Sequence, residues 1–132
     1  MSTFQNNITI HKPIEAVYAF LSDMNNHEQL MPEEVSDWSS TEDEARFTVK
    51  NMIKLALAIS QRTAPTELVC KPIEDAPFGL TLSWKLEDMG SEQTKATFVI
   101  DAELNMMMKM MASGPLQKLV DHQVQTLEKA LG

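Results

Sequence analysis

The sequence predicts an α+β domain in which a curved antiparallel sheet grips a long C-terminal helix. Three observations support this prediction. Apolar and polar residues alternate through most of residues 35–104, which is typical of strands that bury one face. Short turn-forming segments separate these strands, which favours a meander. Residues 116–131 change to an apolar stripe at helical spacing, and a helix of that kind can cover the apolar face of the sheet.

The N-terminal segment predicts one strand followed by two short helices. Residues 4–11 alternate like a strand and end at a proline, Pro13, which suits the first turn of a helix because a first-turn residue needs no N–H partner. Asn25 and Asn26 are candidate caps for a second short helix, which Pro32 would end. Two helices make this connection too long for a hairpin. With this first strand, the sheet is expected to have about six to seven strands.

The middle of the chain predicts six successive strands. The expected strands are residues 35–40, 46–50, 53–60, 67–71, 78–87 and 95–104. The expected breaks between the later strands are Asn51, residues 64–66, residues 75–77 and residues 89–91. With one apolar face on each strand, this sheet needs a cover, and the C-terminal helix has the matching stripe.

A methionine cluster precedes the last helix. Residues 106–112 are expected to form a short helical entry, and the long helix should begin near Pro115, after Gly114. Within the entry, the methionines expected to point inward are Met107, Met110 and Met111, while Met106 and Met108 would lie at the rim. Two interpretations stay open, because thioether side chains both fill ordinary cores and line adaptable binding cavities.

Composition limits the classes of function. The 132 residues are expected to form one domain, residues 1–132, and carry a formal net charge of −8, which argues against nucleic-acid partners and docking on anionic lipid. No apolar run is long enough for membrane insertion, and the first residues do not resemble a secretory signal. Cys70 is the only cysteine, which favours a reducing compartment and hence the cytoplasm.

No catalytic or metal-binding constellation is evident in the sequence. The three histidines, His11, His27 and His122, are far apart and lack metal-ligand spacing. Cys70 shares a strand face with Leu68 and is expected to be a buried, inert thiol. Most acidic residues fall in turns or on outward positions, so no cofactor, metal or catalytic residue is predicted.

The larger inward-facing side chains are the best candidates for the lining of a cavity. Alternation directs Phe47, Trp84 and Phe98 toward the helix, and a buried Trp84 would need a partner for its indole N–H. Gln123 lies beside the apolar stripe, where its amide would either orient a ligand or reach the rim of the cavity. The full predicted lining is Phe47, Leu57, Trp84, Phe98, Met107, Met111, Leu119 and Gln123.

Three segments resemble one superfamily of proteins. They are residues 8–32 (ITIHKPIEAVYAFLSDMNNHEQLMP), residues 76–88 (APFGLTLSWKLED) and residues 102–131 (AELNMMMKMMASGPLQKLVDHQVQTLEKAL). Together with the order of the elements, they are similar to small bacterial members of the helix-grip (SRPBCC) superfamily, which includes START-type lipid-transfer domains, birch-pollen-allergen-type proteins and polyketide cyclases. The resemblance implies a cavity between sheet and helix that takes apolar or amphipathic molecules. It carries over no catalytic residue to this chain.

The expected function is therefore the binding of a hydrophobic or amphipathic small molecule, such as a lipid, an aromatic compound or a polyketide-like compound. The interruption at Gly114 and Pro115 suggests that the helix shifts to admit it. Two alternatives stay open. A cyclase- or dehydratase-like enzyme would need an inward acid–base pair, and a protein-interaction module would have a filled core and an exposed apolar patch. The oligomeric state is left open.

Overall fold

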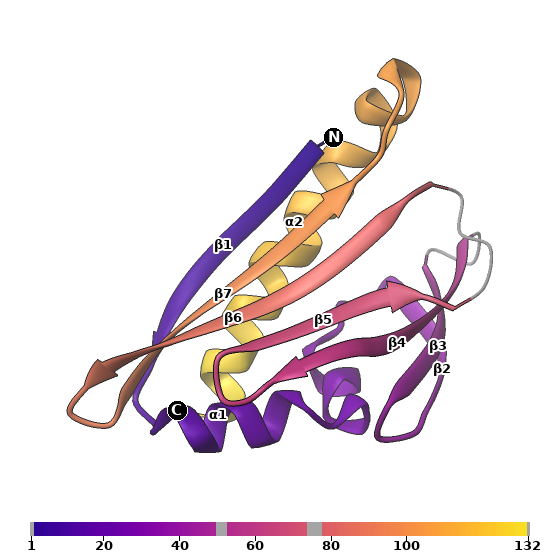
Figure 1. Ribbon diagram of the computed structural model, residues 1–132. Helices are drawn as coiled ribbons and strands as arrows, with labels where there is room; N and C mark the ends of the chain where they lie inside the picture. Colours follow the sequence, from indigo (N-terminus) through magenta and orange to yellow (C-terminus); the bar gives the residue numbers. More distant parts are fainter. Residues whose placement is uncertain (1, 50–52, 74–77, 132) are drawn as a thin grey trace.

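The structure is a computed structural model that describes residues 2–49, 53–73 and 78–131. It contains one curved antiparallel sheet and a long helix, so the predicted α+β architecture is confirmed (Figure 1). The strands are β1 (Ser2–Ile10), β2 (Val35–Ser40), β3 (Glu44–Val49), β4 (Ile53–Thr63), β5 (Glu67–Pro72), β6 (Leu80–Gly90) and β7 (Gln93–Ala102). The helices are α1 (Ile14–Leu21), the 3₁₀ helix η1 (Met24–Leu30) and α2 (Met106–Leu131).

The sheet has the strand order β1-β7-β6-β5-β4-β3-β2. Consecutive strands from β2 to β7 pair as a meander, and β1 pairs with β7, with Phe4 opposite Ile100. The helices α1 and η1 carry the chain from β1 to the opposite edge of the sheet, where β2 lies. The turn predicted at Asn51 and the strand break predicted at residues 75–77 lie outside the described residues.

Helix α2 lies along one face of the sheet, mainly over β1 and β7. Its side chains Val120, Val124 and Leu127 are buried in the core, as the apolar stripe predicts. On its polar side, Asp121 accepts a hydrogen bond from Asn6 Nδ2 of β1 at 3.0 Å. No helix within the described parts of the chain is long and apolar enough to cross a membrane.

The predicted division of the C-terminal segment is wrong, because α2 is continuous through Pro115. The helix begins early because Asn105 caps it, with Asn105 Oδ1 accepting from Met108 N at 2.9 Å. A proline inside a helix removes one backbone hydrogen bond. Gly114 and Pro115 are both exposed, so water can replace that bond and the helix continues.

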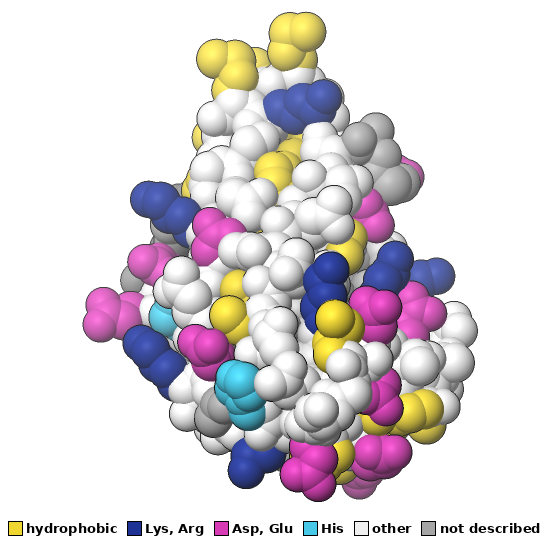
Figure 2. All heavy atoms as spheres, turned by 90° about the vertical axis from the view of Figure 1, so that its left-hand side faces the viewer, with side chains coloured by type: hydrophobic (Ala, Val, Ile, Leu, Met, Phe, Trp, Pro, Cys, Tyr) yellow, Lys and Arg dark blue, Asp and Glu magenta, His cyan; other side chains and the backbone are white. Residues whose placement is uncertain are grey.

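The predicted inward positions of Met107, Met110 and Met111 are also wrong. These side chains are 71%, 85% and 72% exposed, and Met106 is 81% exposed. The start of α2 extends past the end of the sheet, so no strand lies beneath these residues (Figure 1). Figure 2 shows hydrophobic side chains gathered at this projecting tip of the molecule.

The second short helix differs from its prediction in type and in cap. It is a 3₁₀ helix, and Asp23 caps it by accepting from Asn25 N at 3.0 Å. Asn26, expected as a cap, instead donates from Nδ2 to the carbonyl of Phe20 at 2.9 Å. An aspartate that accepts from the N–H two residues later forms a tight local turn, which the two following asparagines obscured in the sequence.

Candidate functional site

A small, partly open cavity lies where the sheet, η1 and α2 meet. Its volume is about 20 Å³, roughly the room that one water molecule needs. The residues that line it are Met24, His27, Met31, Leu57, Cys70, Leu82, Trp84, Phe98 and Gln123. A second hollow, of about 60 Å³, lies on the β2–β3 hairpin and is lined mainly by polar residues, so it offers no apolar enclosure.

The sheet side of the cavity follows from strand alternation. Leu82 and Trp84 are two residues apart on β6 and share one face, and Cys70 lies opposite Leu82 on β5. Trp84 lies opposite Phe98 of β7, and the two rings stack with centroids 4.6 Å apart and planes at 27°. This aromatic pair gives the cavity a rigid, mainly apolar floor.

Trp84 has a buried hydrogen-bond donor without a partner. Its side chain is only 2% exposed, and Nε1–H meets no acceptor among the described residues. The other tryptophan behaves as expected, because Trp38 Nε1 donates to Ser40 Oγ at 2.9 Å. An unpaired buried polar group costs about 1–3 kcal/mol, so the exception at Trp84 needs an explanation.

Gln123 brings a buried acceptor to the same cavity. Its side chain is 1% exposed, and Oε1 meets no donor within the described chain. Its Nε2 donates to Met31 Sδ at 3.5 Å, a weak bond because a thioether is a poor acceptor. Trp84 on β6 and Gln123 on α2, each with one unpaired polar atom, therefore line the same cavity.

His27 is a cavity residue that the sequence analysis missed. It is buried, and its Nε2 lies 2.7 Å from the carbonyl of Leu21, which can only accept, so Nε2 carries the proton. Burial lowers the pKa of His27, while the bond to Leu21 and the charge of Asp23 oppose that shift. Met24, His27 and Leu30 are all buried at three-residue spacing, the period of a 3₁₀ helix, and this was the available signal.

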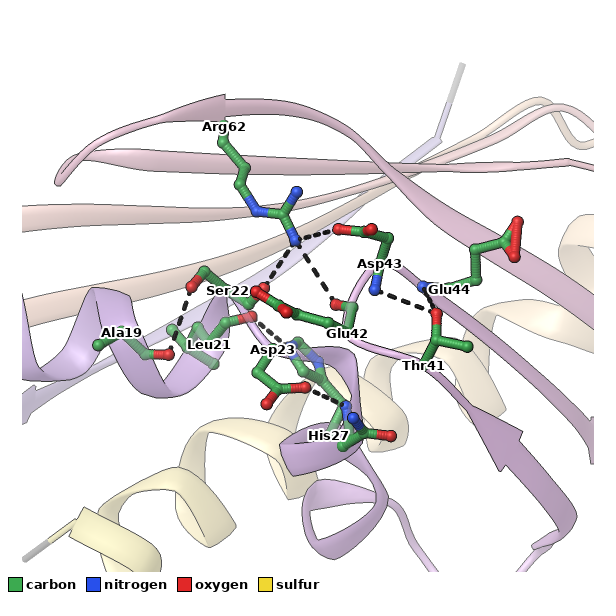
Figure 3. Close-up of polar contacts among 11 residues, drawn as sticks. Ala19, Leu21, Ser22, Asp23, His27, Thr41, Glu42, Asp43, Glu44 and Arg62 are labelled. Atoms are coloured by element: carbon green, nitrogen blue, oxygen red, sulfur yellow. Dashed lines mark hydrogen bonds and ion pairs between the residues drawn. The ribbon is translucent and has the colours of Figure 1, made fainter.

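Arg62 of β4 holds η1 against the sheet (Figure 3). Its Nη2 donates to the carbonyl of Ser22 at 2.8 Å and to that of Glu42 at 3.5 Å, and it pairs with Asp43 Oδ1 at 2.8 Å. The backbone N–H of Met24 also donates to the carbonyl of Glu42 at 2.9 Å. These bonds tie the α1–η1 junction to the β2–β3 turn and so position the η1 side of the cavity.

Cys70 is a buried thiol, as predicted from the strand face that it shares with Leu68. Burial raises its pKa to about 11, and the nearby positive charge of Arg62 offsets only part of this rise. A catalytic cysteine–histidine pair needs a lowered thiol pKa and a protonated histidine. Burial instead raises the pKa of Cys70 and lowers the pKa of His27, so neither shift favours such a pair. No carboxylate occurs among the described residues that line the cavity.

No cluster of metal-ligating side chains occurs in the described segments.

The structure separates the predicted lining residues into two groups. Leu57, Trp84, Phe98 and Gln123 line the cavity. Phe47 is buried but stacks on Trp38 with centroids 5.3 Å apart, and Leu119 is half-buried against the core. Met107 and Met111 lie on the exposed start of α2, away from the cavity, for the reason given above. Besides His27, four residues line the cavity that the sequence did not predict there: Met24, Met31, Leu82 and Cys70.

Comparisons with known proteins find structural likeness without sequence likeness. No family model and no curated protein sequence matches this chain. The protein XoxI from Bacillus cereus is 10% identical, with a TM-score of 0.79 over 99% of this chain and 96% of that chain. A START superfamily protein from Mycobacterium smegmatis is 14% identical, with a TM-score of 0.73 over 98% and 96%. The Zhui aromatase/cyclase from Streptomyces sp. R1128 is 11% identical, with a TM-score of 0.75 over 98% and 93%. The predicted resemblance is therefore confirmed for the fold, which is START-like and polyketide-cyclase-like.

Proposed function

We propose that this chain binds a hydrophobic or amphipathic small molecule in the cavity between the sheet, η1 and α2. The observation that carries the proposal is the pair of unpaired polar atoms, Trp84 Nε1 and Gln123 Oε1, in an otherwise largely apolar enclosure. Ligand sites combine apolar walls with a few convergent polar groups in this way. Structural neighbours described as a START superfamily protein and an aromatase/cyclase support the proposal at the level of fold.

The cavity must enlarge to accept a ligand, because ligand pockets usually measure about 300–1,000 Å³. Met24 and Met31 are the adaptable part of its wall, since unbranched thioether side chains change rotamer at low cost. Met31 is half-buried just after η1 and is connected to α2 by its weak contact with Gln123 Nε2. A ligand that displaces Met31 therefore enters between η1 and α2 while the sheet stays intact.

Native mass spectrometry of the chain purified from its own host tests the proposal, followed by solvent extraction of bound molecules. The expected result is a stoichiometric small molecule. Trp38→Phe leaves Trp84 as the single tryptophan, so its fluorescence reports occupation of the cavity during titration with the extract. A protein that carries nothing, and whose Trp84 emission responds to no host extract, would contradict the proposal.

Protein interaction is a second candidate function, favoured by the exposed side chains Met106, Met107, Met110 and Met111. Large apolar side chains gathered on a surface often mark contacts with partners. A photo-crosslinker at position 107 should then capture one dominant partner in host cells, and Met110→Gln with Met111→Gln should abolish that capture. Unchanged capture in this double variant would remove the methionines from consideration.

A further inference from the structure

We infer that the ligand of this cavity is a neutral molecule whose hydroxyl group bridges Trp84 and Gln123. The hydroxyl oxygen accepts the hydrogen bond of Trp84 Nε1–H, and the hydroxyl proton is donated to Gln123 Oε1. This inference rests on the proposed function and narrows it to alcohols and phenols.

The size of the enclosure favours one bridging atom. Trp84 and Gln123, which carry the two unpaired groups, both line a space that measures about 20 Å³ before any ligand enlarges it and holds roughly one water-sized group. A single hydroxyl is both donor and acceptor and therefore satisfies both groups from one position. A ketone or ether only accepts, so it would leave Gln123 Oε1 unpaired, and a hydrocarbon would leave both groups unpaired.

The charge of the surroundings favours a neutral ligand. No lysine, arginine, aspartate or glutamate is among the described residues that line the cavity. The titratable residues there are His27, which burial keeps neutral, and Cys70, which burial keeps protonated. A carboxylate ligand would be buried without a counter-charge, which is costly, so fatty acids and other anions are disfavoured.

The remaining walls favour a compact carbon skeleton. Leu57, Leu82 and Phe98 line the cavity together with Trp84 and give it apolar walls. A ring system that carries the hydroxyl would lie against this surface and extend toward Met31, whose side chain would change rotamer to make room. The hydroxyl thus fixes the buried end of the ligand, and apolar contact supplies most of the affinity.

Four probes with one shared skeleton test the inference by calorimetric titration near pH 7. They are 2-naphthol, 2-methoxynaphthalene, naphthalene and 2-naphthoate. Each hydrogen bond gained by a buried group should improve the dissociation constant by up to about tenfold. We expect 2-naphthol to bind about tenfold or more tightly than naphthalene, 2-methoxynaphthalene to fall between them, and 2-naphthoate to bind most weakly.

Two variants and two matched controls locate the effect. Trp84→Phe removes the donor and Gln123→Met removes the acceptor, so each should reduce the preference for 2-naphthol over naphthalene by several-fold. Trp38→Phe and Gln117→Met change the same residue types outside the cavity and should keep the preference. Unfolding curves identify any variant that does not fold, and the probe series on the unmodified protein stands without the variants.

The outcomes separate the inference from the function on which it rests. Equal affinity for naphthalene and 2-naphthol, or tight binding of 2-naphthoate, would refute a neutral ligand with a bridging hydroxyl group. Either result would leave the proposed binding of small molecules intact. The structure of a molecule extracted from the host protein tests the inference directly. A bound molecule without a neutral hydroxyl group would contradict it. Binding of no probe, together with no co-purified molecule, would refute both proposals.

Discussion

Replacing Gln123 by methionine should make the protein more stable while weakening its hydroxyl site. Gln123 is 1% exposed, its Oε1 is unpaired, and its Nε2 makes only the weak contact with Met31. Methionine has similar length and helix propensity, so the helix backbone and the packing change little. The substitution therefore removes an unsatisfied buried acceptor at small cost.

The size of the gain follows from the cost of that acceptor. Removing an unpaired buried carbonyl should stabilise the folded protein by about 1–3 kcal/mol. Losing the contact with sulfur reduces this gain by roughly 0.5 kcal/mol. We expect Gln123→Met to raise the free energy of unfolding by about 0.5–2.5 kcal/mol. A chain of 132 residues has an unfolding entropy near 0.28 kcal/mol/K, so the midpoint temperature should rise by roughly 2–9 °C.

Urea unfolding at 25 °C and thermal unfolding, followed by circular dichroism, measure both quantities. Gln117→Met is the matched control on the same helix, because Gln117 Nε2 donates to Asp121 Oδ1 at 2.9 Å and to the carbonyl of Gln5 at 3.4 Å. The control should lose about 0.5–1.5 kcal/mol. A loss of 1 kcal/mol or more in Gln123→Met would refute the reasoning, because it would show that the Gln123 amide is fully satisfied in the folded protein.

Three further predictions concern groups whose environments the structure defines. Burial lowers the pKa of His27 below 6.5, so the unfolded chain takes up the proton first and stability should fall as the pH drops below about 6.5. Urea unfolding at pH 7 and pH 5 should show a smaller loss in His27→Gln, while the exposed control His11→Gln keeps the loss; equal losses would contradict the assignment. Burial raises the pKa of Cys70 from 9.0 to about 11, so the thiolate fraction near pH 8 is about 100-fold lower in the folded protein. Iodoacetamide should therefore label Cys70 in urea but hardly at all in the folded protein. Rapid labelling of the folded protein would count against burial. Replacing Met107 and Met111 by glutamine should change the free energy of unfolding by less than about 0.5 kcal/mol and leave the affinity for 2-naphthol unchanged. A clear loss of affinity would show that these methionines do line the cavity.

The floor of the candidate site was predictable because it depends on strand alternation, which is local. Residues two apart on a strand share a face, so Trp84 could be directed toward the helix before any partner strand was known. Gln123 was predictable for a similar reason, because helical spacing places it beside the buried stripe of α2. The burial of Cys70 followed from the same alternation, although its place in the cavity lining was not predicted.

The methionine cluster shows where a local pattern is insufficient. Helical spacing indicates which side chains share a face, but not how far the sheet extends beneath that face. Met107 and Met111 would be buried only if strands lay under the start of α2, and the helix passes the end of the sheet there. His27 was missed because 3₁₀ helices are short and their three-residue period is easily overlooked.

The sequence by itself determined the order of the elements, the buried faces of most strands and of α2, and hence a START-like fold. These features depend on neighbours a few residues apart, which periodicity records. Only the tertiary structure decided that the cavity is small, that η1 supplies part of its wall, and that Trp84 and Gln123, whose Nε1 and Oε1 lack partners, both line it. These features depend on how residues about 40 to 100 positions apart are packed, and such packing leaves no periodic signal in the chain.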